Sequence, residues 1–196
     1  LEPRPVDDAE LEGVRVLHED SALRLLAAPL DHAVSCLGFR LEERPRRTML
    51  PERLRAAGIR GPAIKTLQRE GAVVVDGREI TLEEMSVPRP GQAVAVLMDS
   101  RPCRAAHELA EGADLLLASA TYLERDRAWA ERRKDRTALE AARLARSAGA
   151  KKLVLTHFDP MYERLEPFLE EASRLFADVA LAEDGARFPV PRPKKP

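Results

Sequence analysis

Three short, continuous apolar runs constrain the fold of this chain more than any other feature. They lie at residues 93–98, 115–117 and 153–156. Because none of them alternates with polar residues, each run predicts a strand that is covered on both faces. Helix-like segments alternate with the runs, at residues 103–111, 137–147 and 160–176. This order predicts helices and strands layered around a sheet.

Local signals refine that picture. Residues 33–43 alternate apolar and polar side chains in their second half, as a half-buried strand does. Thr137 and Glu140 have the spacing of a capping box, and Gly149 is a natural stop for the helix that begins there. We therefore expect a fourth strand and a well-defined helix start.

The composition is that of a soluble globular protein. The 196 residues suffice for one core with a small appendage, and the formal charge of -1 gives no global attraction to nucleic acid. Two distant cysteines favour a reducing compartment, and no apolar run approaches the length of a membrane helix. We expect a cytoplasmic protein that has no membrane partner. The chain opens on Leu1 rather than Met, which favours a truncated gene.

Residues 44–78 differ in character from the rest of the chain. They hold nine Lys or Arg and three Asp or Glu, together with turn signals at Gly61-Pro62 and Asp76-Gly77. The segment predicts a protruding insertion. Two interpretations stay open for it: a solvated Arg-rich surface, or a surface that contacts the phosphate backbone of a nucleic acid.

Asp99, His157 and His32 are the candidates for chemistry. Asp99 follows the run at 93–98, His157 follows the run at 153–156, and His32 precedes the strand expected at 33–43. The carboxyl ends of buried strands are where sheet proteins place ligands, and a carboxylate with imidazoles suits zinc or manganese. Each residue also has a purely structural interpretation, Asp99 as a helix cap and the histidines as hydrogen-bonded loop residues.

Several segments occur in an order and spacing shared with a known family. They read PLDHAVSCLGFRLEE, GIRGPAIKTLQREG with VVVDGREI, PGQAVAVLMDSRPC, ELAEGADLLLASATY and KKLVLTHFDPMY. Together they resemble ribonuclease Z, the tRNA 3′-processing endonucleases of the metallo-β-lactamase superfamily, and most closely the bacterial short form. The resemblance covers roughly residues 27–162 and corresponds to the later part of the family's chain.

The resemblance implies a fold and a set of site residues. The fold is α+β, a metallo-β-lactamase-like αββα four-layer sandwich, here mainly its C-terminal half plus a flexible arm. Residues 1–43 and 79–185 would form the partial domain, residues 44–78 the tRNA-binding arm, and residues 186–196 a disordered tail. His32, Asp99 and His157 match metal ligands of a site for two zinc ions. The arm positions are Arg53, Arg55, Arg60, Gly61, Pro62, Lys65 and Arg69.

The chain also departs from the family pattern. The HxHxDH motif, which supplies most of the family's ligands, is absent. Ser119 stands where the family has a glutamate, and Asp135 where it has a histidine thought to assist the leaving group, so the catalytic residues stay unknown. Asp159 and Met161 also replace usual residues. We therefore expect this chain alone to bind zinc weakly and to be inactive.

The resemblance implies a zinc-dependent endoribonuclease that removes the 3′ trailer from precursor tRNA, commonly as a homodimer. The substitutions at Ser119 and Asp135 keep a second hypothesis open: a non-catalytic tRNA-binding or partner subunit. A third, a different phosphodiesterase or hydrolase of the same fold, is disfavoured by the basic arm.

Overall fold

The structure is a computed structural model that describes residue 6 and residues 12–191. The chain divides into two compact units. The larger unit is formed by Leu1–Arg44 with Gln92–Pro196, and the smaller one by Pro45–Gly91. Each unit has its own cluster of buried apolar side chains.

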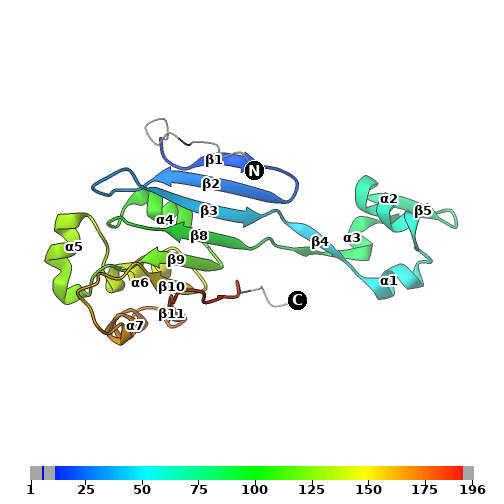
Figure 1. The fold of residues 1–196 in the computed structure, drawn as a ribbon. Helices are drawn as coiled ribbons and strands as arrows, with labels where there is room; N and C mark the ends of the chain where they lie inside the picture. The colour runs from blue at the N-terminus through cyan, green and yellow to red at the C-terminus, as the bar shows by residue number, and fades with distance from the viewer. Residues whose placement is uncertain (1–5, 7–11, 192–196) are drawn as a thin grey trace. The chain divides into compact units, whose positions relative to one another are not determined.

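A seven-stranded mixed sheet forms the framework of the larger unit (Figure 1). Its strands lie in the order β1-β2-β3-β8-β9-β10-β11. Pairing is antiparallel from β1 to β8 and parallel from β8 to β11. The strands are β1 (Arg15–Glu19), β2 (Leu23–Pro29), β3 (Leu37–Glu43), β8 (Ala93–Leu97), β9 (Leu115–Ser119), β10 (Leu153–Thr156) and β11 (Val179–Leu181).

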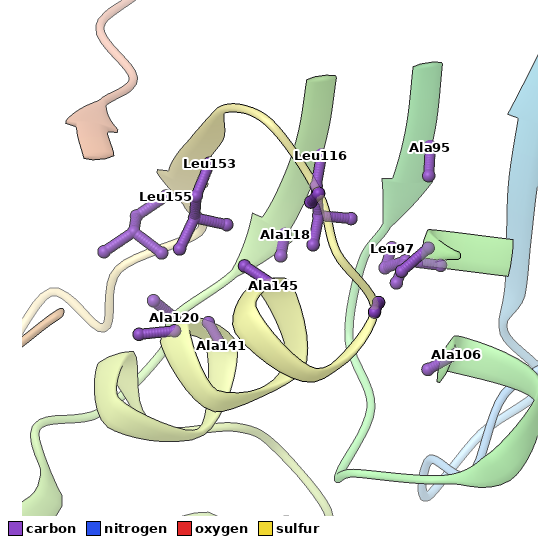
Figure 2. Close-up of a cluster of buried hydrophobic side chains, with 14 of the residues drawn as sticks. Ala95, Leu97, Ala106, Leu116, Ala118, Ala120, Ala141, Ala145, Leu153 and Leu155 are labelled. Carbon is purple, nitrogen blue, oxygen red and sulfur yellow. The ribbon is translucent and has the colours of Figure 1, made fainter. Parts of the chain in front are cut away.

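Helices α4 (Arg104–Ala110), α6 (Ala138–Ser147) and α7 (Glu166–Ser173) contribute to the core that lies on one face of this sheet. Leucines of the strands, among them Leu97, Leu116 and Leu155, point toward alanines of the helices (Figure 2). Because alanine adds little bulk to a helix, it lets the helix axis approach the sheet closely. Side chains on the opposite face of the sheet are less covered, and Leu41 is 43% exposed there.

The smaller unit consists of two antiparallel strand pairs and three short helices. Strand β4 (Arg46–Met49) pairs with β7 (Ser86–Arg89), and β5 (Ala72–Val75) pairs with β6 (Arg78–Thr81). The helices are α1 (Pro51–Ala56), α2 (Pro62–Glu70) and α3 (Leu82–Met85). Leu54, Ile59, Leu67 and Ile80 form its core.

Both predicted turns of this unit are confirmed. Gly61, with a φ of 53°, immediately precedes α2, which begins at Pro62. Asp76 and Gly77 both have positive φ and connect β5 to β6, as expected for a two-residue hairpin turn. These positions require the left-handed backbone that glycine and aspartate tolerate.

The boundary predicted for the insertion differs from the structure. We expected it to end at residue 78, whereas the compact unit continues to Gly91. The physical reason is the pairing of β7 with β4, which ties the returning chain to the outgoing strand. Short, partly exposed strands of this kind carry little periodicity that a sequence could reveal.

The strands predicted from the apolar runs are confirmed as β8, β9 and β10, and the capping box of Thr137 and Glu140 is present at the start of α6. The strand expected at 33–43 begins only at Leu37, and the helix expected at 160–176 is confined to α7. β1, β2, β11 and the short helix α5 (Arg127–Arg133) were not predicted. None of the helices in the described residues is long and apolar enough to span a membrane.

The predicted disordered tail lies only partly in the described residues, because 192–196 fall outside them. Residues 186–191 form neither helix nor strand. The Gln92 side-chain amide donates hydrogen bonds to the carbonyls of Val190 (3.1 Å) and Pro191 (2.9 Å). This part of the tail therefore contacts Gln92, the residue before β8.

Candidate functional site

The parallel part of the sheet brings the candidate residues to one edge. Strands β8, β9 and β10 run in the same direction and in register, with Leu97 opposite Ala118 and Ser119 opposite Thr156. The loops that follow them emerge together, as loops at the carboxyl ends of parallel strands do. Asp99 and His157 lie at the beginning of two of these loops.

Asp99 and His157 form a close pair. Asp99 Oδ1 lies 3.0 Å from His157 Nδ1, and Thr121 Oγ1 lies 3.4 Å from the same nitrogen. Asp99 Oδ1 is buried, and because its contact with His157 is not aligned as a hydrogen bond, it accepts no hydrogen bond from the described residues. The backbone of His157 has a φ of 59°, a strained conformation for a residue with a Cβ, and such strain clusters at functional sites.

His32 is oriented by the backbone of a distant loop. Its Nδ1 lies 3.0 Å from the carbonyl oxygen of Lys134. Because a carbonyl can only accept a hydrogen bond, Nδ1 carries the proton and Nε2 keeps its lone pair free for a metal ion. Asp31 accepts a hydrogen bond from Lys134 Nζ at 3.0 Å and so ties the two loops together a second time.

Asp135 joins these residues. Its carboxylate oxygen Oδ1 lies 3.6 Å from His32 Nδ1, and the residue is only 6% exposed. Burial raises the pKa of Asp135, the nearby His32 opposes that shift, and the charge of Asp99 adds to it. His157 lowers the same pKa, so both the Asp99–His157 pair and His32 act on this carboxyl. The structure thus forms two pairs, His32 with Asp135 and Asp99 with His157, in loops at the same edge of the sheet.

Ser119 contributes no charge to this edge. It is fully buried at the end of β9, and its hydroxyl donates to the carbonyl of Met98 at 3.2 Å. The hydroxyl therefore serves the backbone of the loop that carries Asp99. A carboxylate at this position would have to accept hydrogen bonds rather than donate one.

The donors fit zinc in kind but fall short in number. Imidazole nitrogens and carboxylate oxygens are zinc ligands, and Asp99 Oδ1 and Asp135 Oδ1 are both buried without a hydrogen-bond partner in the described part of the chain. Within that same part, no three His, Cys, Asp or Glu side chains are grouped closely enough to hold an ion. Since zinc sites need three or four ligands, these residues fit as part of a metal centre.

Two groups that help to form the site could not be predicted from the sequence. The Lys134 carbonyl is 102 residues from His32 in the chain, and Lys134 has a left-handed φ of 57°. Arg136 is completely buried, and its Nη2 donates to Ser100 Oγ at 2.8 Å, beside Asp99. A buried arginine cannot be distinguished from the many surface arginines of this sequence by its neighbours in the chain.

The arm positions named from the sequence are all exposed in the smaller unit. Arg53 and Arg55 lie on α1, and Pro62, Lys65 and Arg69 lie on α2. Arg60 and Gly61 form the connection between the two helices. Arg69 pairs with Glu70, whereas Arg53 and Arg55 donate to backbone carbonyls and keep their charge uncompensated.

No protein-family model matches the chain. It is 45% identical over 173 residues to the ribonuclease Z of Nocardia farcinica, a match that covers 88% of this chain and 57% of the relative. The ribonuclease Z of Thermobifida fusca is 40% identical over 195 residues, covering 97% and 60%. This chain is a homologue of ribonuclease Z. It spans about three fifths of the length of these relatives.

Solved structures agree on the fold. The metallo-β-lactamase-fold protein YhfI of Bacillus subtilis superposes with a TM-score of 0.56 at 20% identity, covering 88% of this chain and 51% of YhfI. The short form of human tRNase Z superposes with a TM-score of 0.55 at 20% identity, covering 91% and 48%. The α+β, metallo-β-lactamase-like fold expected from the sequence is thereby confirmed.

Proposed function

We propose that this chain supplies part of the active site of a zinc-dependent endoribonuclease that removes the 3′ trailer from precursor tRNA. The observation that supports the proposal is the Asp99–His157 pair, with His32 in a loop at the same edge of the sheet, in a chain homologous to ribonuclease Z. The short form of human tRNase Z, which has the same fold, supports tRNA as the substrate.

Each residue has a definite role in this proposal. A bound zinc pair would lower the pKa of water and neutralise charge on the phosphoryl oxygens. His32 would bind through Nε2, since Nδ1 is committed to the Lys134 carbonyl. Asp99 would offer Oδ1, which accepts no hydrogen bond in the described residues, and His157 lies 3.0 Å from it. Asp135 and the Lys134 carbonyl together orient the ring of His32.

The remaining ligands would come from elsewhere. We expect the 196-residue chain to bind zinc only weakly by itself, because the described residues bring together too few donors for a four-coordinate ion. Isothermal titration of the chain with zinc measures this directly. Two tightly held ions per chain would contradict the idea that the site is partial.

Cleavage of precursor tRNA is tested with a fusion protein that also contains the segment this chain lacks relative to its homologues. Fusing it to the segment of the Thermobifida fusca relative that it does not match should give an enzyme that releases the trailer from precursor tRNA. Asp99→Ala and His157→Ala in the fusion should each lower the cleavage rate about 100-fold or more, since metal ligands are lost. Arg104→Ala, an exposed change on α4, is the matched control.

A second candidate function, a non-catalytic tRNA-binding or partner subunit, is favoured by Ser119 and Asp135. If the fusion binds precursor tRNA without cleaving it, Asp135→His tests whether this position is the cause. Recovery of cleavage would identify Asp135 as the lesion in an otherwise intact site. Binding without recovery would favour the non-catalytic subunit.

We also propose that the exposed arm residues contact the tRNA backbone. Arg53→Glu, Arg55→Glu and Lys65→Glu together should weaken tRNA binding and flatten its dependence on salt, because fewer counterions are released. The control reverses three exposed charges of the larger unit, Arg104, Arg143 and Arg146. An equal loss from both triple variants would show that net charge, rather than the arm, governs binding.

We also propose that the complete protein is a homodimer and that it works in the cytoplasm. Two free cysteines support a reducing compartment. The homology to ribonuclease Z supports the dimer, which sedimentation of the chain at several concentrations would test.

A further inference from the structure

The only tryptophan of the chain, Trp129, lies on the short helix α5 and is 47% exposed. Single exposed apolar side chains are common on protein surfaces and need no explanation by themselves. Trp129 differs because the guanidinium carbon of Arg132 lies 5.6 Å from its ring centroid, a cation–π pair that holds the ring at the surface. In α5, only Ala130 is buried, so the helix does not use its tryptophan as a core residue.

Helix α5 ends just before Asp135, whose carboxylate lies 3.6 Å from His32 Nδ1. The carbonyl of Ala130, the residue after Trp129, accepts a hydrogen bond from the backbone nitrogen of Asp135 at 2.8 Å. Arg133, at the end of the helix, lies 3.9 Å from Asp159. Trp129 precedes Arg133 by four residues, which is about 6 Å along a helix axis. That separation is about the distance between neighbouring phosphates of an extended RNA strand, so Trp129 and Arg133 could contact adjacent nucleotides.

The charge around the ring suits a nucleic acid. Helix α5 carries Arg127, Arg132 and Arg133 against the single acidic residue Glu131. Arg127 is paired with Glu124 and Arg133 lies near Asp159, whereas Arg132 is exposed and pairs with no acidic side chain of the described residues. An aromatic face with neighbouring guanidinium groups is the combination that binds single-stranded nucleic acid, since bases stack on the ring and phosphates meet the cations.

We propose that Trp129 and Arg132 form a stacking platform for an unpaired RNA base that lies next to the phosphate to be cleaved. This inference rests on the proposed function for the identity of the ligand. It adds a binding residue that acts by stacking, independently of the metal ligands and of the basic arm. Such a platform would select substrates with an unpaired nucleotide at this position over fully paired ones.

The tryptophan itself reports on the proposal, because it is the only one in the chain. Its fluorescence, excited where nucleotides do not absorb, should be quenched when a short single-stranded RNA binds to the 196-residue chain. The same oligonucleotide with abasic sites should bind through its phosphates without comparable quenching. Fluorescence anisotropy of labelled RNA measures binding separately in each case.

Variants complete the test. Trp129→Ala should weaken binding of the base-containing RNA about tenfold, whereas Trp129→Phe should keep most of the affinity because a ring remains. Val16→Ala, which shortens a similarly exposed side chain on β1, is the matched control and should change nothing. Circular dichroism of all three variants verifies that each is folded.

The outcomes separate this inference from the proposed function. RNA that binds without quenching, or with equal affinity for Trp129→Ala and the parent chain, would overturn the platform and leave the proposed function standing. RNA that does not bind at all would overturn both. A blue shift that depends on protein concentration without RNA would assign Trp129 to a protein interface and overturn the inference.

Discussion

At the candidate site, the residues proposed to bind metal are positioned by neighbouring groups that would not bind the metal themselves. The Lys134 carbonyl fixes the protonated nitrogen of His32, and the hydroxyl of Ser119 holds the backbone before Asp99. Arg136 is an extreme case, because it is 0% exposed and only its Nη2 has a hydrogen-bond partner in the described residues. Burial lowers the pKa of Arg136, which shows how unfavourable this environment is for its charge.

Arg136→Met should leave the chain folded, with a melting temperature equal to or above that of the parent. Replacing a buried ion by an apolar side chain of similar volume is often neutral or stabilising, since the cost of desolvating the charge is removed. Arg136→Ala is the comparison, and the cavity it leaves should lower the free energy of unfolding by about 2–5 kcal/mol. Loss of the fold in Arg136→Met would show that the hydrogen bond to Ser100 is essential.

At the scale of elements, a carboxylate joins three helical segments of the larger unit. Glu171 on α7 accepts hydrogen bonds from the backbone nitrogens of Glu124 (3.0 Å) and Leu139 (3.0 Å). Glu124 begins the short 3-10 helix Glu124–Asp126, and Leu139 lies in the first turn of α6. Burial raises the pKa of Glu171, although both hydrogen bonds oppose that shift.

The sign of this shift fixes a pH dependence. Because the folded-state pKa lies above the unfolded value, the ionised carboxylate lowers stability above the folded pKa. Protonation relieves this cost as the pH falls through the folded pKa toward the ordinary glutamate pKa of 4.5. Glu171→Gln removes the charge. It should be at least as stable as the parent at pH 7 and lose that advantage as the pH is lowered to the unfolded pKa, as chemical denaturation at several pH values would measure.

Glu171→Ala is the comparison for that prediction. It leaves two backbone nitrogens without their acceptor and should lower the free energy of unfolding by about 1–3 kcal/mol near the unfolded pKa, where the parent bears no cost of a buried charge. A stability difference between Glu171→Gln and the parent that does not change with pH would contradict the raised pKa of Glu171.

At the scale of the whole molecule, each unit has its own core, and the chain leaves and rejoins the main sheet at paired positions. Glu42 pairs with Ala93, and the backbone nitrogen of Glu43 donates to the carbonyl of Gln92 at 2.8 Å. The chain therefore leaves the large sheet on β3 and returns to it on β8 at adjacent points. The smaller unit is therefore inserted between β3 and β8, and these two strands still pair with each other in the sheet.

Replacing residues 44–91 by Asn-Gly, so that the paired residues Glu43 and Gln92 flank the turn, should therefore leave the larger unit folded. A two-residue turn of this type connects antiparallel strands whose ends are adjacent. The shortened chain should keep a cooperative melting transition and lose most of its affinity for tRNA, as calorimetry and anisotropy would show. Loss of the melting transition would mean that the larger unit needs the smaller one to fold, and unchanged tRNA affinity would contradict the assignment of the arm.

Much of the framework could be predicted from local sequence. The apolar runs at β8, β9 and β10 identified the central strands because a strand buried on both faces has a pattern of its own. The positions of Asp99 and His157 followed, since each residue directly succeeds such a strand. The turns at Gly61 and Asp76 were equally local, because their backbone angles restrict which residues can occupy them.

The sequence by itself determined where the central strands lie and which residues stand at their ends, because those properties depend on neighbours within a few residues. Only the tertiary structure decided that Lys134 meets His32, that Arg136 is buried, and that β7 returns to β4 to extend the smaller unit to Gly91. Each of these depends on contacts between residues far apart in the chain, which local periodicity does not encode.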